Sequence, residues 1–255
     1  MTLTPYYQDD HATLYLGEAC DILNRLDPGT FDAVITDPPY SSGGMFRSDR
    51  VADPTAKYRG WSQNEDGTSR APTATYSTFS GDCRDQRTWM MWVSAWGTAC
   101  AQASKPGAHI FQFTDWRQLP ATTDATQLGG WTWRGIIVWD KGVGRPMKGR
   151  FRNHLEFITW ATLGPHERTE AYPSTLIKVP TVHSTKRVHL TEKPVELLEA
   201  ILSVVPGDDL LILDPFAGSG STLVAATQTG HRSVGIELDE HYAEVAAKRL
   251  QDLGA

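Results

Sequence analysis

Cysteine is scarce in this chain, and long apolar runs and internal repeats are absent from it. Its 255 residues include only three cysteines, Cys20, Cys83 and Cys100, at spacings that suit neither a disulfide framework nor a metal knuckle. No apolar run approaches the length that crosses a membrane, and the first six residues lack the charged and apolar parts of an export signal. These absences argue against disulfide stabilisation, membrane insertion and a metal centre, and they favour a reducing cytoplasm.

An excess of basic charge is also missing. The formal net charge is −6, so a polyanionic partner would need a local basic patch rather than the whole surface. Hydrophobic residues make up 40% of the chain and charged residues 21%, which excludes disorder as a whole. We expect residues 1–255 to form a single catalytic domain with a substantial core.

Short apolar runs alternate with helical periodicity along the chain. Strands are expected at residues 13–16, 31–36, 109–113, 131–139, 155–161, 210–213 and 233–237, and helices at 20–26, 86–104, 194–204, 221–229 and 239–250. The aromatic face of the helix at 86–104, with Trp89, Trp92 and Trp96, is expected to pack in the core. This order predicts an α/β fold of Rossmann-like, doubly wound type, with a mostly parallel sheet and one long polar insertion.

Two short segments at opposite ends of the chain each follow a buried strand. They read Asp37-Pro38-Pro39-Tyr40 and Asp214-Pro215-Phe216-Ala217-Gly218-Ser219-Gly220. In an open parallel sheet both would lie at the carboxyl ends of the strands, where ligands bind. We therefore interpret them as two halves of one active site.

The glycine-rich segment suits a cationic nucleoside cofactor. Its two glycines let the backbone approach a ligand closely, but they do not form the Gly-x-Gly-x-x-Gly pattern of a pyrophosphate loop. Asp214 would repel a pyrophosphate and attract a cation. S-adenosylmethionine, with its ammonium and sulfonium groups, therefore fits better than NAD, and Glu237 at the end of the next strand is placed to accept its ribose hydroxyls.

The proline-rich segment is suited to hold an amino group. Two prolines fix the backbone and remove two N–H donors, which leaves a stiff display of acceptors. The Asp37 carboxylate and the Pro38 carbonyl can accept hydrogen bonds from an NH₂ group, and Tyr40 can stack on a flat base. Such an arrangement favours attack by a planar exocyclic amine on a methyl sulfonium.

Together these motifs resemble the amino-methylating DNA methyltransferases that use S-adenosylmethionine. The segment His189-Leu190-Thr191-Glu192-Lys193-Pro194 is similar to the family's His-Pro-Thr-Gln-Lys-Pro element, and Gly17-Glu18 to its Gly-Asp element. The order, with the catalytic tetrapeptide first and the cofactor loop second, is that of the β group. The resemblance implies a circularly permuted, seven-stranded methyltransferase sheet. The cofactor-binding residues that we expect from it and from the residue chemistry are Glu18, Asp37, Thr191, Lys193, Asp214, Phe216, Ala217, Gly218, Ser219, Gly220, Ser221, Thr222 and Glu237; the catalytic residues are Asp37, Pro38, Pro39 and Tyr40.

The permuted order also makes structural sense. After residue 237 only one helix remains, so the cofactor half of the sheet needs one more strand, and residues 13–16 can supply it. The loop that carries Glu18 would then lie beside Glu237. The strands that end at residues 213 and 36 would be neighbours at the switch point of the sheet, which places the donor methyl beside Asp37.

DNA contact is expected from the variable regions 41–85, 141–153 and 164–188. Residues 141–152 are basic without any acid, and they can follow phosphates. The expected DNA-binding residues are Lys141, Arg145, Lys148, Arg150, Arg152, Arg47 and Arg50. Because a base inside a duplex cannot reach such a site, double-stranded DNA would be bound with the target nucleotide flipped out.

The expected reaction is methylation of the N6 amine of adenine in a short DNA sequence. Aspartate at the first position of the tetrapeptide, where the family also uses serine, favours adenine over the N4 amine of cytosine. A catalytically silent DNA-binding relative is the alternative of another class. A homodimer and a restriction endonuclease partner remain open.

Overall fold

The computed structural model describes residues 3–40, 62–63, 69–70, 85–142, 144, 148–149, 151–181 and 193–254. The chain forms two compact units, one of Met1–Pro38 with Met90–Ala255 and one of Pro39–Trp89. In the second unit the short strands β4 (Ser62–Gln63) and β5 (Ser69–Arg70) pair antiparallel. All of the remaining strands belong to the first unit.

A sheet runs through the first unit, and within the described residues it has nine strands in the order β1-β2-β11-β10-β3-β6-β8-β7-β9. Neighbours from β2 to β6 pair parallel, whereas β8 pairs antiparallel with both β6 and β7. The strands are β1 (Tyr7–Gln8), β2 (Ala12–Leu16), β3 (Phe31–Thr36), β6 (Ser104–Thr114), β7 (Thr132–Asp140), β8 (Leu155–Thr162), β9 (Leu176–Lys178), β10 (Leu211–Asp214) and β11 (Arg232–Glu237).

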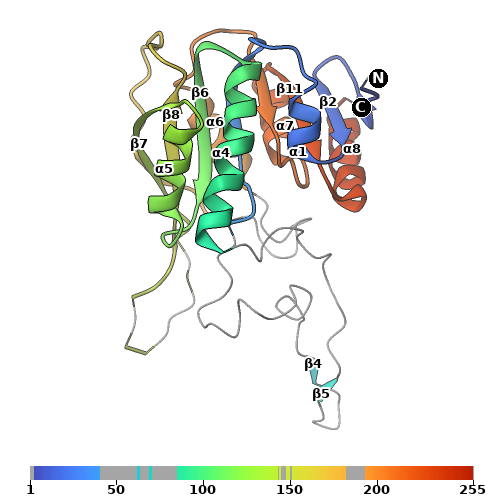
Figure 1. The fold of residues 1–255 in the computed structure, drawn as a ribbon. Coiled ribbons are helices and arrows are strands. Elements are labelled where there is room, and N and C mark those ends of the chain that lie inside the picture. Colours follow the sequence, from blue (N-terminus) through green and yellow to red (C-terminus); the bar gives the residue numbers. More distant parts are fainter. Residues whose placement is uncertain are drawn as a thin grey trace. The chain divides into compact units, whose positions relative to one another are not determined.

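Helices cover both faces of this sheet, as the alternating pattern predicts. Figure 1 shows α1, α4 and α5 over the face turned to the viewer. On the other side α6 packs against α7 and α7 against α8; α7 contacts β10 and β11, and α8 contacts β2 and β11. The helices are α1 (Ala19–Leu23), α4 (Gln86–Ala103), α5 (Leu119–Leu128), α6 (Val195–Leu202), α7 (Ser221–Gln228) and α8 (Glu240–Gly254).

The N-terminal strand completes the cofactor half of the sheet. β2 pairs parallel with β11 over five positions, from Ala12 opposite Ser233 to Leu16 opposite Glu237. Ala12 and Leu14 of β2 are buried in a cluster with residues of α7 and α8. The doubly wound, mostly parallel fold is therefore confirmed, and so is the place of residues 13–16 beside residues 233–237.

The expected number of seven strands is wrong for the described residues, because two edge strands were not predicted. β1 has two residues and pairs antiparallel with β2, and β9 has three residues and pairs parallel with β7. Strands this short show no alternation of apolar and polar residues. Helix α5 was missed as well, since threonines occupy its buried face at Thr122, Thr123 and Thr126.

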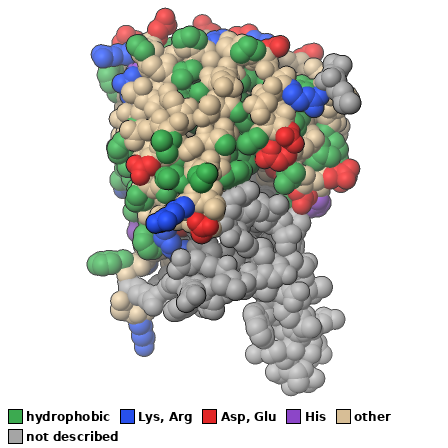
Figure 2. Space-filling view, viewed as in Figure 1, with side chains coloured by type: hydrophobic (Ala, Val, Ile, Leu, Met, Phe, Trp, Pro, Cys, Tyr) green, Lys and Arg blue, Asp and Glu red, His purple; other side chains and the backbone are tan. Residues whose placement is uncertain are grey.

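The surface in Figure 2 shows acidic and basic side chains interspersed with apolar ones over the described part of the face in view. Among the described residues, no helix combines the length and the apolar character that spanning a membrane requires.

Candidate active site

Two acids meet at the carboxyl edge of the parallel sheet. β3 and β10 are direct neighbours, with Ala33 opposite Ile212 and Val34 opposite Leu213, and Asp37 follows β3 whereas Asp214 ends β10. Burial is the largest of the causes that raise the pKa of Asp214 to about 7, and the nearby charge of Asp37 adds to it, although hydrogen bonds from the Thr222 hydroxyl and the Phe216 N–H act in the opposite direction. The fold therefore brings together the two segments in which we expected the active site.

The Asp37 carboxylate is bound by a buried lysine. Lys193 Nζ donates to Asp37 Oδ2 and lies 3.4 Å from Glu156 Oε2. Glu156 Oε1 accepts from Lys141 Nζ at 2.9 Å. Sequence reasoning assigned Lys193 to the cofactor and missed Glu156, which looks like an ordinary residue of a strand.

The cofactor loop owes its shape to two left-handed glycines. Gly218 has φ +53° and Gly220 φ +79°, and Gly220 precedes the first residue of α7. A Cβ on Gly220 would lie 2.9 Å from the Cβ of Ala246 in α8, so only glycine lets the loop pass this close to the helix. A Cβ on Gly218 would meet no atom within 4 Å, which leaves open space above the loop.

Glu237 holds this loop in place. Its Oε2 accepts from the Gly218 N–H at 2.8 Å and its Oε1 from the Asp239 N–H at 2.8 Å. Burial raises the pKa of Glu237 above its usual value. A carboxylate has about four acceptor sites, so Glu237 can still accept from a ligand such as a ribose diol.

The loop of Glu18 lies beside Glu237, as expected from the permuted order. The Gly17 N–H donates to the Glu237 carbonyl at 2.8 Å. The Glu18 side chain caps α1 by accepting from the Asp21 N–H at 3.1 Å, and it is exposed. The cap supports α1 and sets the direction of the Glu18 side chain.

The hydroxyl side chains of the cofactor loop are already engaged within the protein. Arg249 of α8 donates to the Ser219 carbonyl at 2.8 Å, and its Nη1 lies 3.3 Å from Ser219 Oγ and 3.4 Å from Ser221 Oγ. The loop is also tied to the sheet, because the Ala217 N–H donates to the Ile236 carbonyl at 2.9 Å.

Phe216 packs against Trp92 and Trp96 of α4, with ring centroids 5.2 and 5.3 Å apart. The two tryptophans therefore support the cofactor loop in addition to filling the core; their spacing of one helical turn was the available signal.

Some of the predicted site residues belong to the second unit or to the basic loop, and others lie outside the described residues. Pro39 and Tyr40 belong to the second unit, in which the Pro39 carbonyl accepts from Trp89 Nε1 at 2.7 Å. Of the basic loop, Lys148 and Arg152 are exposed, and Figure 1 shows its described part extending below the sheet. Outside the described residues lie Thr191, Arg47, Arg50, Arg145 and Arg150.

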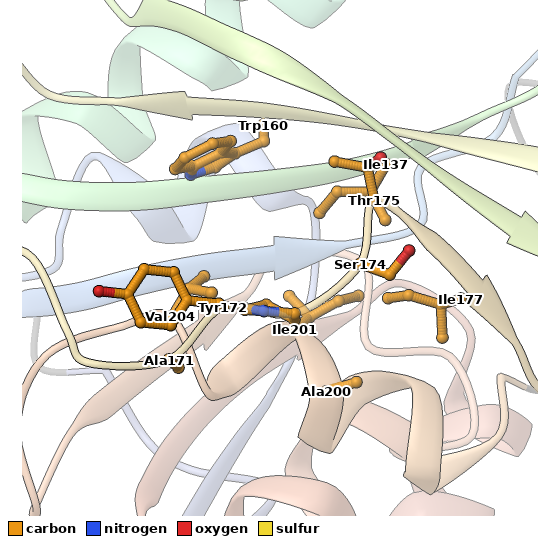
Figure 3. A pocket seen from close by; sticks show the side chains of 11 residues that line it. Ile137, Trp160, Ala171, Tyr172, Ser174, Thr175, Ile177, Ala200, Ile201 and Val204 are labelled. Atoms are coloured by element: carbon orange, nitrogen blue, oxygen red, sulfur yellow. The ribbon is translucent and has the colours of Figure 1, made fainter.

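A separate cavity of about 220 Å³ lies between β7, β8, α6 and residues 171–177. Figure 3 shows its apolar lining, with Trp160, Ile137 and Ile201 among the side chains around it. None of its lining side chains is charged, so it lacks an acid or base for group transfer. Among the described residues, no three His, Cys, Asp or Glu side chains form a cluster that could hold a metal.

The arrangement at the sheet edge fits a cationic nucleoside. A buried acid, Asp214, stands at the end of β10, and open space lies above Gly218. The acid Glu237 stands at the end of the adjacent strand β11 with acceptor capacity left for a ligand, and the half-buried ring of Phe216 in the same loop rests on Trp92 and Trp96. These groups can bind positive charge, a diol and a flat ring, and Asp37 beside them can hold a hydrogen-bond donor.

Comparison with known proteins identifies the family of this chain. The family described as DNA methylase matches residues 31–248. Type II methyltransferase M2.DpnII of Streptococcus pneumoniae is 27% identical over 97% of this chain and 92% of its own length. Type II methyltransferase M.ScaI of Streptomyces caespitosus is 23% identical over 97% of this chain and 84% of its own length.

Two solved structures show the same fold. The M1.HpyAVI–SAM complex has a TM-score of 0.64 at 23% identity, covering 94% of this chain and 98% of that one. The PvuII DNA methyltransferase, described as cytosine-N4-specific, has a TM-score of 0.72 at 14% identity, covering 97% of this chain and 89% of that one. The family match extends from β3 into α8 and so covers most of the chain. The chain therefore belongs to the DNA methylase family of N6 and N4 methyltransferases.

Proposed function

We propose that this DNA methyltransferase acts on the exocyclic N6 amine of adenine within a short DNA sequence. The observation that carries the proposal is the carboxylate of Asp37 at the end of β3, beside the cofactor loop that follows β10. An ionised carboxylate can accept a hydrogen bond from either proton of an amine, and it cannot itself donate a hydrogen bond. Aspartate at this position of the tetrapeptide favours adenine, whereas the N4 amine of cytosine is the alternative that the same chemistry serves.

The methyl donor is S-adenosylmethionine. When bound, it would supply a methyl group on a positively charged sulfur: the lone pair of a nitrogen would form the new bond to the methyl carbon while the carbon–sulfur bond breaks, which would leave neutral S-adenosylhomocysteine as the product. Asp214 and Glu237 would hold its positive charge and its ribose, and the loop from Phe216 to Gly220 would surround it. In addition we propose that Glu18, Thr191, Ser221 and Thr222 contribute to this site.

Asp37 prepares the amine for attack. By accepting a hydrogen bond from the NH₂ group it increases the electron density on nitrogen and fixes the direction of the lone pair. Pro38 and Pro39 restrict the backbone, and Tyr40 is proposed to stack on the base. The positive charge that develops on nitrogen is stabilised by Asp37, and the nitrogen then releases one proton to water.

DNA is proposed to be held by exposed basic side chains and to present its base flipped out of the duplex. Lys148 and Arg152 are exposed at the described part of the basic loop. Arg145, Arg150, Arg47 and Arg50 complete the proposed set. Lys141 is already paired with Glu156, so it would add less to phosphate binding than the exposed residues.

Transfer of label to nucleosides tests this proposal. A long amplified DNA of mixed sequence, free of methylation, is incubated with tritiated S-adenosylmethionine, digested to nucleosides and separated by chromatography. Label in N6-methyldeoxyadenosine supports the proposal, and label in N4-methyldeoxycytidine supports the alternative. Absence of label would favour a silent DNA-binding relative, and an Asp37→Asn protein prepared in parallel controls for contaminating methyltransferases.

A further inference from the structure

Four charged side chains form a continuous series of ion pairs that begins at the carboxylate of Asp37. Asp37 contacts Lys193, Lys193 contacts Glu156 at 3.4 Å, and Glu156 contacts Lys141 at 2.9 Å. The groups come from four places in the fold: the residues that follow β3 and β7, the start of the antiparallel strand β8, and the residue that precedes Pro194 and α6. These four side chains carry two negative and two positive charges, so together they have no net charge.

Lys193 is enclosed on several sides. Its side chain is only 7% exposed. Its Nζ lies 4.9 Å from the ring centroid of Phe113 and 5.9 Å from that of Trp139, distances at which an ammonium is attracted to an aromatic face. Two carboxylates and two rings therefore fix the position of the ammonium.

We propose that Glu156 is a positioning residue for methyl transfer, which holds the Lys193 ammonium in place while Asp37 turns its acceptor oxygens to the target amine. This inference rests on the proposed function and adds to it a role for a residue of β8. Lys141 in turn holds Glu156, which connects the catalytic acid to the first residue of the basic loop.

The reason is that the amine and Lys193 share the negative charge of one carboxylate. When the amine takes up its oxygens, Lys193 loses part of its hydrogen bond, and a buried ammonium without a counter-ion is costly. Glu156 then remains as the second counter-ion. If Glu156 were uncharged, Lys193 would compete with the substrate for Asp37, and Asp37 would be a poorer acceptor.

Electrostatics support this geometry. Burial by itself would lower the pKa of Lys193, but the Asp37 and Glu156 carboxylates outweigh burial and raise the pKa. Burial would raise the pKa of Glu156, but Lys193 and Lys141 outweigh burial and lower that pKa. Among the described residues, Asp214 also lies near Asp37, whose charge helps to raise the pKa of Asp214.

The test compares Glu156→Gln, Glu156→Asp and the wild type in single-turnover transfer to the DNA substrate. For Glu156→Gln we expect a loss of about 100-fold in rate, the scale of a misplaced reacting group, with cofactor dissociation constants within about threefold, because the cofactor residues are unchanged. Asp209→Asn is the matched control, since it removes a carboxylate from an exposed pair with Arg232 and should leave the rate unchanged.

The pH dependence separates positioning from a merely structural role. With one carboxylate fewer, the pKa of Lys193 falls, so the alkaline limb of the rate profile moves to lower pH in Glu156→Gln. Glu156→Asp retains the charge but shortens the reach, so its rate falls while the alkaline limb stays in place. NMR titration of ¹³Cε-labelled lysines measures the pKa of Lys193 directly and without turnover. The Lys193 signal is assigned from a Lys193→Met protein.

Wild-type rate and an unmoved alkaline limb in Glu156→Gln would overturn the inference. If Glu156→Gln loses cooperative unfolding, Glu156→Asp decides: slower transfer with an unchanged Lys193 titration supports positioning, and a wild-type rate rejects it. No label transfer by the wild type itself would reject the proposed function, whereas normal transfer by wild type and by both Glu156 variants rejects only the role of Glu156.

Discussion

At the scale of single residues, the decisive feature is the sharing of the charge of Asp37. Its carboxylate is 21% exposed and bound by Lys193, and it faces the buried Asp214. A free carboxylate would sample several orientations, but an ion pair with a lysine enclosed by Phe113 and Trp139 restricts it. This restriction prepares an acceptor before the substrate arrives.

Asp37→Asn should lower methyl transfer by about 100-fold or more, the scale at which single preorganised polar groups act in enzymes. The amide keeps the shape of the carboxylate but has only one acceptor oxygen and carries no charge. Single-turnover label transfer measures the loss, and cofactor binding measured by calorimetry should change by less than about threefold. Asp252→Asn, at an exposed position in α8, is the control; near-normal transfer by Asp37→Asn would disprove the role of Asp37.

Asp214→Asn should stabilise the apo protein at alkaline pH. Burial raises the pKa of Asp214 from 3.8 to about 7 in the folded state. The folded protein therefore binds a proton that the unfolded chain has lost, and the free energy of unfolding falls as pH rises through this interval. Asparagine has no such dependence, so the variant should gain about 3 kcal/mol relative to wild type between pH 5 and pH 8.

Urea unfolding at both pH values checks this result. Asp209→Asn should show no comparable gain, because the Asp209 carboxylate is exposed. An Asp214→Asn advantage that is equal at pH 5 and pH 8 would show that Asp214 is not protonated in the folded state near neutral pH.

At the scale of elements, the junction between the cofactor loop and α7 depends on the packing of α8. Gly220 precedes α7 with φ +79° and leaves no room for a Cβ beside Ala246, and Arg249 one turn further along α8 binds Ser219 and Ser221. On the other side of the loop, Phe216 contacts two tryptophans of α4. The loop is thus held by helices on both faces of the sheet.

Gly220→Ala should cost more stability than Gly230→Ala. Both glycines have φ +79°, but a Cβ on Gly230 meets no atom within 4 Å, whereas one on Gly220 meets Ala246. Backbone strain is therefore common to both variants, at about 1–2 kcal/mol. The Ala246 contact adds about 1–3 kcal/mol in Gly220→Ala alone. Free energies of unfolding from urea titration give the difference, and equal losses would contradict the close packing of α8.

How far elements could be predicted depended on their length and periodicity. β3 matches its predicted range at Phe31–Thr36, and α4, α7 and β8 differ from theirs by about one residue at an end, because each has a strong apolar pattern. β6 begins at Ser104, five residues before the predicted strand, since Lys105, Pro106 and Gly107 interrupt the pattern. β1, β9 and α5 were not predicted because tertiary pairing and burial, rather than local pattern, define them.

At the scale of the whole molecule, DNA binding by an acidic protein requires local positive charge. The net charge is −6, and the described face in Figure 2 mixes both signs. The proposed contact is therefore confined to loops such as the one that carries Lys148 and Arg152.

Lys148→Glu should weaken DNA binding and reduce its dependence on salt. Each lost phosphate contact lowers the slope of log affinity against log salt concentration by about 0.9. Fluorescence anisotropy with a labelled duplex at several salt concentrations measures this slope. Lys248→Glu makes the same charge change at an exposed position of α8 and is the control; identical slopes for the two variants would place the DNA contact elsewhere.

The sequence by itself determined the chemistry of this protein and the order of its elements. The two acid-containing loops, the glycine pattern and the acid at Glu237 could be read directly, because local residue types set the backbone freedom and charge of each loop. Only the tertiary structure decided that Glu156 joins Lys193 at Asp37 and that Phe216 packs on Trp92 and Trp96. Such contacts join residues far apart in the chain, and they depend on which strands pair and which helix covers them, so no local pattern encodes them.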